Sequence, residues 1–97
     1  PGKQEVESAV LAHAAVYGDD TAQCFAVGEC ELPHSEGVLP ALAGEIGEVI
    51  LGEKAGRTSG AEITVFDSTG IALQDIATAA ALLQAAQETG KGQTVTL

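Results

Sequence analysis

The sequence predicts an α/β fold with parallel strands, and three features of the chain support this. The first is a strand, a sharp turn and an apolar helix that follow one another from residue 56, GRTSGAEITVFDSTGIALQD. The second is an earlier apolar strand, Ala14–Tyr17, followed at once by a capped helix. The third is the alternation of strands and helices along the chain, which favours parallel pairing with helices layered on the sheet.

The central strand is Ile63–Phe66, whose β-branched and aromatic side chains are typical of a short, largely buried strand. Asp67 or Ser68 is expected to end the strand and to cap a helix that begins near Thr69. This helix, 69–88, is apolar on most sides, which is the pattern of a buried helix. Its entrance would present free backbone N–H groups, where a carboxylate, a phosphate or a carboxamide oxygen binds.

The first part of the chain predicts two short helices around the strand Ala14–Tyr17. Before the strand, we expect a loop and then an amphipathic helix, with an inner face formed by Val6, Ala9, Val10 and Ala14. After the strand, Asp20 precedes Gln23 by three residues, which is a capping-box pattern at a helix start. Gly28 is expected to end this second helix.

Proline and glycine residues, which interrupt helices and strands, divide the middle and the end of the chain. Residues 29–38 are expected to form a surface loop, because proline, glycine and charged residues mix there. Pro40 suits the first position of a helix that Gly52 ends, and 53–60 is a turn-rich connector. Beyond the long helix, Gln93–Leu97 alternates polar and apolar residues, which predicts a last strand.

Composition is that of a globular chain with an aliphatic core. Of its 97 residues, 45% are hydrophobic and 3% aromatic, and the formal net charge is −10. This charge argues against nucleic acid or an anionic membrane as a partner, because both require clustered Lys and Arg. A chain of this length alone is marginally stable. The sequence starts at Pro1 without a signal-peptide pattern, and we expect an excised or processed segment.

Cysteine and histidine usage predicts no metal site. Cys24 and Cys30 form an isolated pair without a histidine at zinc-ligand spacing, so two reduced thiols of a cytoplasmic protein are expected. His13 and His34 have no partner at a motif spacing and are interpreted as structural or surface residues.

Two motifs carry a resemblance to a known family. G-R-T-S-x-x-E-I-T-V-F-D-S-T-G-I-A-L-Q-D resembles the C-terminal signature of the ornithine cyclodeaminase/mu-crystallin family, nearest to its archaeal-type alanine dehydrogenases. The opening P-G-K-Q-E resembles a second motif of that family. The resemblance implies that 1–55 are the closing βα units of a Rossmann-type dinucleotide-binding domain. It implies that 56–97 carry a ligand-contacting turn, a long buried helix and a final strand of a substrate and dimerisation domain.

The same resemblance implies three contact residues. Lys3 would lie beside the bound NAD or NADP, Ser68 would contact the nicotinamide part of the cofactor, and Thr69 would contact the substrate. Read without the family, Lys3 is a solvated lysine, and the two hydroxyls are helix caps. Asp75 is expected to be a buried structural carboxylate that pairs with Arg57 or a backbone donor.

Several parts of an active site are not found in the sequence. No G-x-G-x-x-G run is present, since the glycines from Gly44 to Gly52 have another spacing and fall in a predicted helix. The family's proton-transferring aspartate lies just before P-G-K, and its substrate-binding lysine and arginine belong to the N-terminal domain. We therefore expect no catalytic residue in these 97 residues, and a larger homodimeric enzyme around them.

Three functions remain open from the sequence. The leading one is part of an NAD(P)-dependent oxidoreductase that moves hydride at the α-carbon of an amino acid or its imine. The second is a non-enzymatic protein of the mu-crystallin kind that holds NADPH and a ligand. The third is a structural α/β fragment, which binding of NAD(H) to the chain would exclude.

Overall fold

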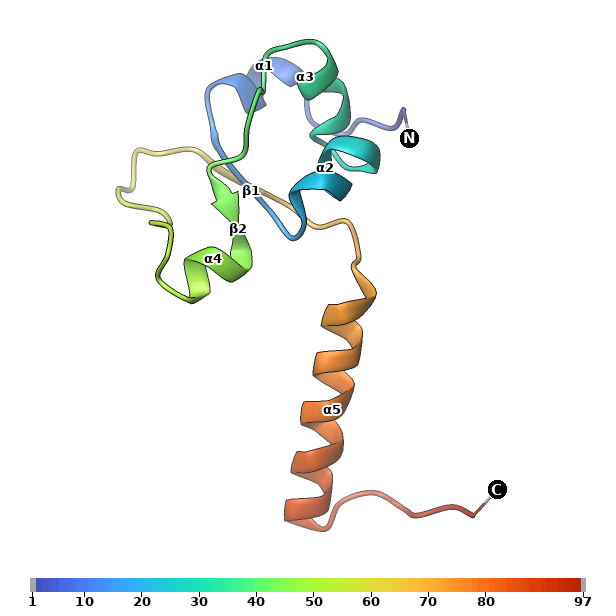
Figure 1. Ribbon diagram of the computed structural model, residues 1–97. Coiled ribbons are helices and arrows are strands. Elements are labelled where there is room, and N and C mark those ends of the chain that lie inside the picture. Colours follow the sequence, from blue (N-terminus) through green and yellow to red (C-terminus); the bar gives the residue numbers. More distant parts are fainter. Residues whose placement is uncertain (1, 97) are drawn as a thin grey trace.

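The computed structural model describes residues 2–96, which form eight elements. In chain order they are α1 (Ser8–Ala12), β1 (Ala15–Gly18), α2 (Thr21–Val27), α3 (Glu31–Ser35), β2 (Gly44–Glu45), α4 (Ile46–Ile50), β3 (Thr64–Asp67) and α5 (Ala72–Thr89). A three-stranded sheet, a group of short helices beside it and one long projecting helix make an elongated molecule of 53 × 32 × 20 Å (Figure 1).

The sheet has the order β2-β1-β3, and both neighbours pair with β1 in parallel. Val16 pairs with Val65 and Tyr17 with Phe66, so the two apolar strands predicted from sequence lie side by side. The predicted α/β class with parallel pairing is confirmed. Because the strands are parallel, their carboxyl ends meet at one edge of the sheet.

The core lies on one face of this sheet, under the helices α1, α2 and α3 (Figure 1). Its buried members are Leu11, Val16, Cys24, Cys30 and Leu39. Val6 and Ala14 pack against it as expected, but Val10 is 43% exposed. The predicted inner face of the first helix is therefore partly wrong, because α1 spans only 8–12 and turns Leu11 inward.

The second helix starts as its sequence predicts. Asp20 is the N-cap of α2, and its side chain accepts a hydrogen bond from Gln23 N at 2.9 Å. The reciprocal half of a capping box is missing, because Gln23 Nε2 donates instead to the carbonyl of Thr69 at 3.2 Å. Gly28 is the C-cap, as predicted.

The segment between α2 and β3 differs from the prediction in two places. The expected surface loop 29–38 contains the helix α3, because Cys30 and Pro33 are buried in the core. The helix expected from Pro40 begins only at Ile46, after β2 pairs with β1. A full capping box at Glu45 and Glu48 fixes that start, a signal that outweighed the proline.

The long helix α5 is present but is not buried. It begins at Ala72, ends at Gly90 in the left-handed conformation (φ 70°), and contains no buried residue. Figure 1 shows it projecting away from the sheet, with the C-terminus at its far end. Its apolar pattern indicates a helix that needs cover, and no other element of residues 2–96 covers it, so its burial in a larger assembly stays a prediction.

The last predicted strand is also not formed over the described residues. Gln93–Thr96 is irregular, and Leu97 lies outside the described part. Alternation alone does not make a strand without a neighbouring edge to pair with, and this segment follows α5 away from the sheet (Figure 1). Among residues 2–96, no helix combines the length and the apolar character needed to cross a bilayer.

Candidate functional site

Acidic residues lie where the three parallel strands end. Asp19 follows β1, Glu45 ends β2 and Asp67 ends β3. The backbone N–H of Asp19 donates to the carbonyl of Asp67 at 3.3 Å, so the pairing of β1 with β3 continues to the edge. In open parallel sheets, ligands bind in the crevice outside this edge.

A cavity of about 330 Å³ opens at this edge, and it brings the three predicted site residues together. It is lined by Lys3, Glu5, Val27, Gly28, Glu29, Asp67, Ser68 and Thr69. Lys3 comes from the start of the chain, whereas Ser68 and Thr69 follow β3. Two segments more than 60 residues apart in sequence therefore contribute to one site.

Asp19 holds the turn that contains two of these residues. Its carboxylate accepts hydrogen bonds from Thr69 N at 2.7 Å, from the Thr69 hydroxyl at 2.8 Å and from Gly70 N at 3.2 Å. It also accepts from the N–H of Asp20 at 2.8 Å, and the residue is only 7% exposed. Burial alone would raise the pKa of Asp19, but the hydrogen bonds from Thr69, Asp20 and Gly70 outweigh it and hold the pKa below its ordinary value.

This arrangement corrects the expected helix entrance. The N-cap of α5 is Ile71, which has no side-chain cap, so neither Asp67 nor Ser68 caps the helix. Gly70 has a left-handed backbone (φ 78°), which breaks the helical path before it starts. The N–H groups of Thr69 and Gly70, predicted to be free for a ligand, are already bound by Asp19. Ser68 is exposed at the cavity.

Carboxylates of the α2–α3 region hold the segment that carries Lys3. Glu29 accepts from the N–H of Glu5 with both oxygens and from the N–H of Val6, each at 3.0 Å. Glu31 accepts from the N–H of Gly2 at 2.9 Å. Lys3 is itself exposed, so its position at the cavity follows from its anchored neighbours.

Gly28 allows the side chains of Asp67 and Thr69 to pack closely against the backbone at the cavity. Asp67 is 5% exposed and accepts a hydrogen bond from Cys30 N at 3.2 Å. A Cβ atom at Gly28 would overlap the Asp67 carboxylate and come within 2.9 Å of Thr69 Cγ2. Glycine is required here for space rather than for an unusual φ, since its φ is −90°.

The predicted partnership of Asp75 with Arg57 is wrong. Asp75 is exposed in the first turn of α5, so its carboxylate is solvated and needs no buried partner. Arg57 donates instead to the Thr64 hydroxyl at 2.9 Å and to the carbonyl of Gly60 at 3.1 Å.

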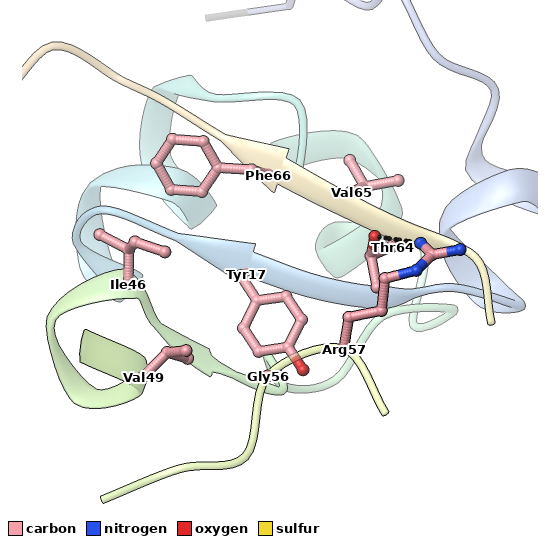
Figure 2. A pocket seen from close by; sticks show the side chains of 8 residues that line it. All are labelled: Tyr17, Ile46, Val49, Gly56, Arg57, Thr64, Val65 and Phe66. Atoms are coloured by element: carbon pink, nitrogen blue, oxygen red, sulfur yellow. Dashed lines mark hydrogen bonds between the residues drawn. The ribbon is translucent and has the colours of Figure 1, made fainter. Parts of the chain in front are cut away.

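Arg57 also borders a second, smaller cavity of about 180 Å³ with an apolar lining (Figure 2). Tyr17, Ile46 and Phe66 face it, and the Tyr17 hydroxyl donates to the carbonyl of Ala55 at 3.1 Å. Tyr17 and Phe66 alternate along their strands with the core residues Val16 and Val65, so this is the other face of the sheet.

The two cysteines lie in the core, and the two histidines lie at the surface. Cys24 and Cys30 are free and buried, and burial raises the pKa of both thiols, that of Cys24 to about 12. His34 stacks on Phe25 with ring centroids 3.8 Å apart, and His13 is exposed. Within residues 2–96, no three His, Cys, Asp or Glu side chains gather as a metal site.

Comparison with known proteins matches almost the whole chain. Residues 1–90 fit the ornithine cyclodeaminase/mu-crystallin family. The chain belongs to this family. It is 40% identical over 95 residues to the iminosuccinate reductase of Paracoccus denitrificans, covering 97% of this chain and 29% of that protein. The family resemblance of the two sequence motifs is thereby confirmed.

Solved structures agree in fold. An archaeal alanine dehydrogenase dimer with bound NAD matches 100% of this chain and 31% of its own, with a TM-score of 0.82 and 40% identity. The Delta(1)-pyrroline-2-carboxylate reductase of Thermococcus litoralis, in complex with NADH and L-proline, matches 95% of this chain and 29% of its own, with a TM-score of 0.77 and 29% identity. These neighbours support the Rossmann-type assignment of the sheet, and the chain spans under a third of their length.

Proposed function

We propose that the cavity at the carboxyl edge of the sheet binds the nicotinamide end of NAD(H) or NADP(H). The protein that carries this chain then transfers hydride between the cofactor and the α-carbon of an amino acid or its imine. The observation that carries the proposal is the meeting of Lys3, Ser68 and Thr69 in one cavity at the strand ends. Relatives that reduce imino acids or oxidise alanine, with NAD bound in their structures, support the same chemistry.

The lining fits the nicotinamide riboside better than the diphosphate of the cofactor. Three carboxylates, of Glu5, Glu29 and Asp67, lie around the cavity with Lys3 as its cation. The resulting excess of negative charge repels a diphosphate. It favours ribose hydroxyls and the positively charged ring of oxidised nicotinamide. A volume of about 330 Å³ also lies within the range of small-molecule pockets.

Each predicted residue can then be given a role. The cofactor, when bound, supplies the hydride chemistry, and the protein supplies position and electrostatics. Ser68, exposed at the cavity, has a hydroxyl that can donate to or accept from the carboxamide. The Thr69 proton is already donated to Asp19, so its oxygen can only accept, which suits an N–H of a substrate amine or imine.

The two parts of the chain, 1–55 and 56–97, have separate roles in this proposal. Residues 1–55 serve as the closing βα units of the dinucleotide-binding domain, and 56–97 lead from the ligand turn into the substrate and dimerisation domain. The exposed apolar side chains of α5, such as Leu73 at 71% and Leu82 at 66%, pack against the remainder of the enzyme or a homodimer partner. Two free thiols suit a cytoplasmic protein. The net charge of −10 disfavours nucleic-acid and membrane partners.

The test is a titration of the full-length protein with NADH and NADPH, followed by assays with alanine, proline and their imines. Lys3→Ala should raise the KM for the cofactor about tenfold and leave kcat unchanged, because the hydrogen bonds that the Lys3 ammonium donates to the ribose hydroxyls contribute uniform binding. Lys91→Ala, which removes an exposed charge beyond α5, is the matched control and should change neither constant. Absence of cofactor binding refutes the proposal, and binding without turnover identifies the non-enzymatic alternative.

A further inference from the structure

Asp19 is a strongly hydrogen-bonded carboxylate beside the site, and the sequence did not single it out. It is 7% exposed, yet it does not line the cavity itself. Three of its hydrogen bonds reach across 50 or 51 residues of sequence to the backbone and side chain of the turn after β3. An acid placed this way has no direct access to a ligand, but it sets where Thr69 lies.

We propose that Asp19 is the positioning residue of the ligand turn. Its carboxylate fixes the backbone of Thr69 and Gly70 and orients the Thr69 hydroxyl, so that Ser68 and Thr69 face the cavity in one conformation. This inference rests on the function proposed above for the cavity. It adds a residue that acts on cofactor and substrate only through the turn.

The geometry supports positioning rather than simple packing. The Thr69 N–H and hydroxyl go to different oxygens of the same carboxylate, at 2.7 and 2.8 Å, which fixes both the backbone and the side-chain rotamer of Thr69. Charge-assisted hydrogen bonds of this length are about twice as strong as neutral ones. The buried Cys24 thiol also donates to Oδ1 of this carboxylate at 3.7 Å, which further restricts its position.

Asp19→Asn in the full-length protein is the decisive variant. It keeps the shape of the side chain but presents an amide NH₂ to one of the donors, so the turn loses at least one bond. Asp20→Asn is the matched control, because it removes the same charge one residue later and asparagine caps a helix as well as aspartate does. We expect kcat/KM to fall at least tenfold in Asp19→Asn and less than twofold in Asp20→Asn.

A second pair of variants keeps the test valid if Asp19→Asn does not fold. Thr69→Ser retains the hydroxyl and should keep at least half of kcat/KM, whereas Thr69→Val should lose most of it. Where Asp19→Asn does fold, its double variant with Thr69→Val should lose far less than the product of the single losses, because both changes remove the same bond.

Hydrogen exchange separates this inference from the proposed function. The amides of Thr69 and Gly70 should exchange at least tenfold faster in Asp19→Asn than in Asp20→Asn, whether or not any cofactor binds. If exchange is unchanged, positioning by Asp19 is refuted. If exchange accelerates while the folded protein keeps wild-type kinetic constants, Asp19 is merely structural and the inference also fails. If no variant and no wild type binds NADH, it is the proposed function that fails.

Discussion

Glu29→Gln should weaken cofactor binding without slowing the chemical step. The Glu29 carboxylate accepts three N–H···O contacts at 3.0 Å from Glu5 and Val6, and these hold the segment that carries Lys3. A glutamine oxygen can replace only one of the two carboxylate oxygens, and its NH₂ faces an N–H donor. The segment therefore loses about one hydrogen bond to a charged acceptor.

The size of the effect follows from that loss. A hydrogen bond to a charged group contributes roughly 1.5–3 kcal/mol to stability. Because Glu5 is exposed, the bond lost to Glu29 contributes about 1.5 kcal/mol. That corresponds to about tenfold in the docking equilibrium of the segment. Because only the docked state presents Lys3 to the cavity, the apparent Kd for NADH should rise by up to about tenfold, with kcat unchanged.

Fluorescence titration with NADH and steady-state kinetics of the full-length protein measure both quantities. Glu36→Gln is the matched control, because this substitution removes the same charge at an exposed position, the C-cap of α3. An equal loss in both variants would mean a general charge effect, and an unchanged Kd in Glu29→Gln would refute the argument. In the Lys3→Ala background, Glu29→Gln should have no further effect on affinity.

Two further predictions concern stability. Burial raises the pKa of the Cys24 thiol from 9.0 to about 12 and also that of Cys30, so above pH 9 the unfolded chain releases protons that the folded chain keeps. The urea midpoint should therefore fall as pH rises from 9 toward 12, and a double alanine variant of the two cysteines should lose this dependence. Gly28→Ala should cost about 1–3 kcal/mol of unfolding free energy by overpacking against Asp67, whereas Gly47→Ala, with open space around it, should cost nothing.

Elements with local signals could be predicted from the sequence. β1 and β3 follow from short apolar runs, and the start of α2 follows from Asp20, whose cap needs only residues three positions away. α3 could not be placed, because its position depends on tertiary contacts. The helix expected from Pro40 begins later than predicted, because the prediction overlooks the capping box at Glu45 and Glu48. Pro33 is buried in the core, and Gly44 pairs with Tyr17 in β2.

The exposed helix α5 shows what an apolar sequence pattern can and cannot predict. The sequence correctly indicates a helix with apolar residues on most sides, and those side chains are still exposed here, Ile76 at 65% and Leu83 at 61%. A pattern reports that a surface requires a partner, but not which segment supplies it. The chain spans under a third of the relatives' length, and we propose that additional chain or a second copy of the protein covers α5.

The ligand turn combines what the sequence reveals with what it hides. Ser68 and Thr69 could be singled out because they stand in a contiguous motif after a strand. The carboxylate that holds them lies 50 residues earlier, and an Asp-Asp pair after a strand has the local appearance of a helix cap alone. Only Asp20 takes the cap, which leaves Asp19 for the turn. Since carboxyl ends of neighbouring parallel strands always meet, a second acid at such an end is itself a signal of long-range contact.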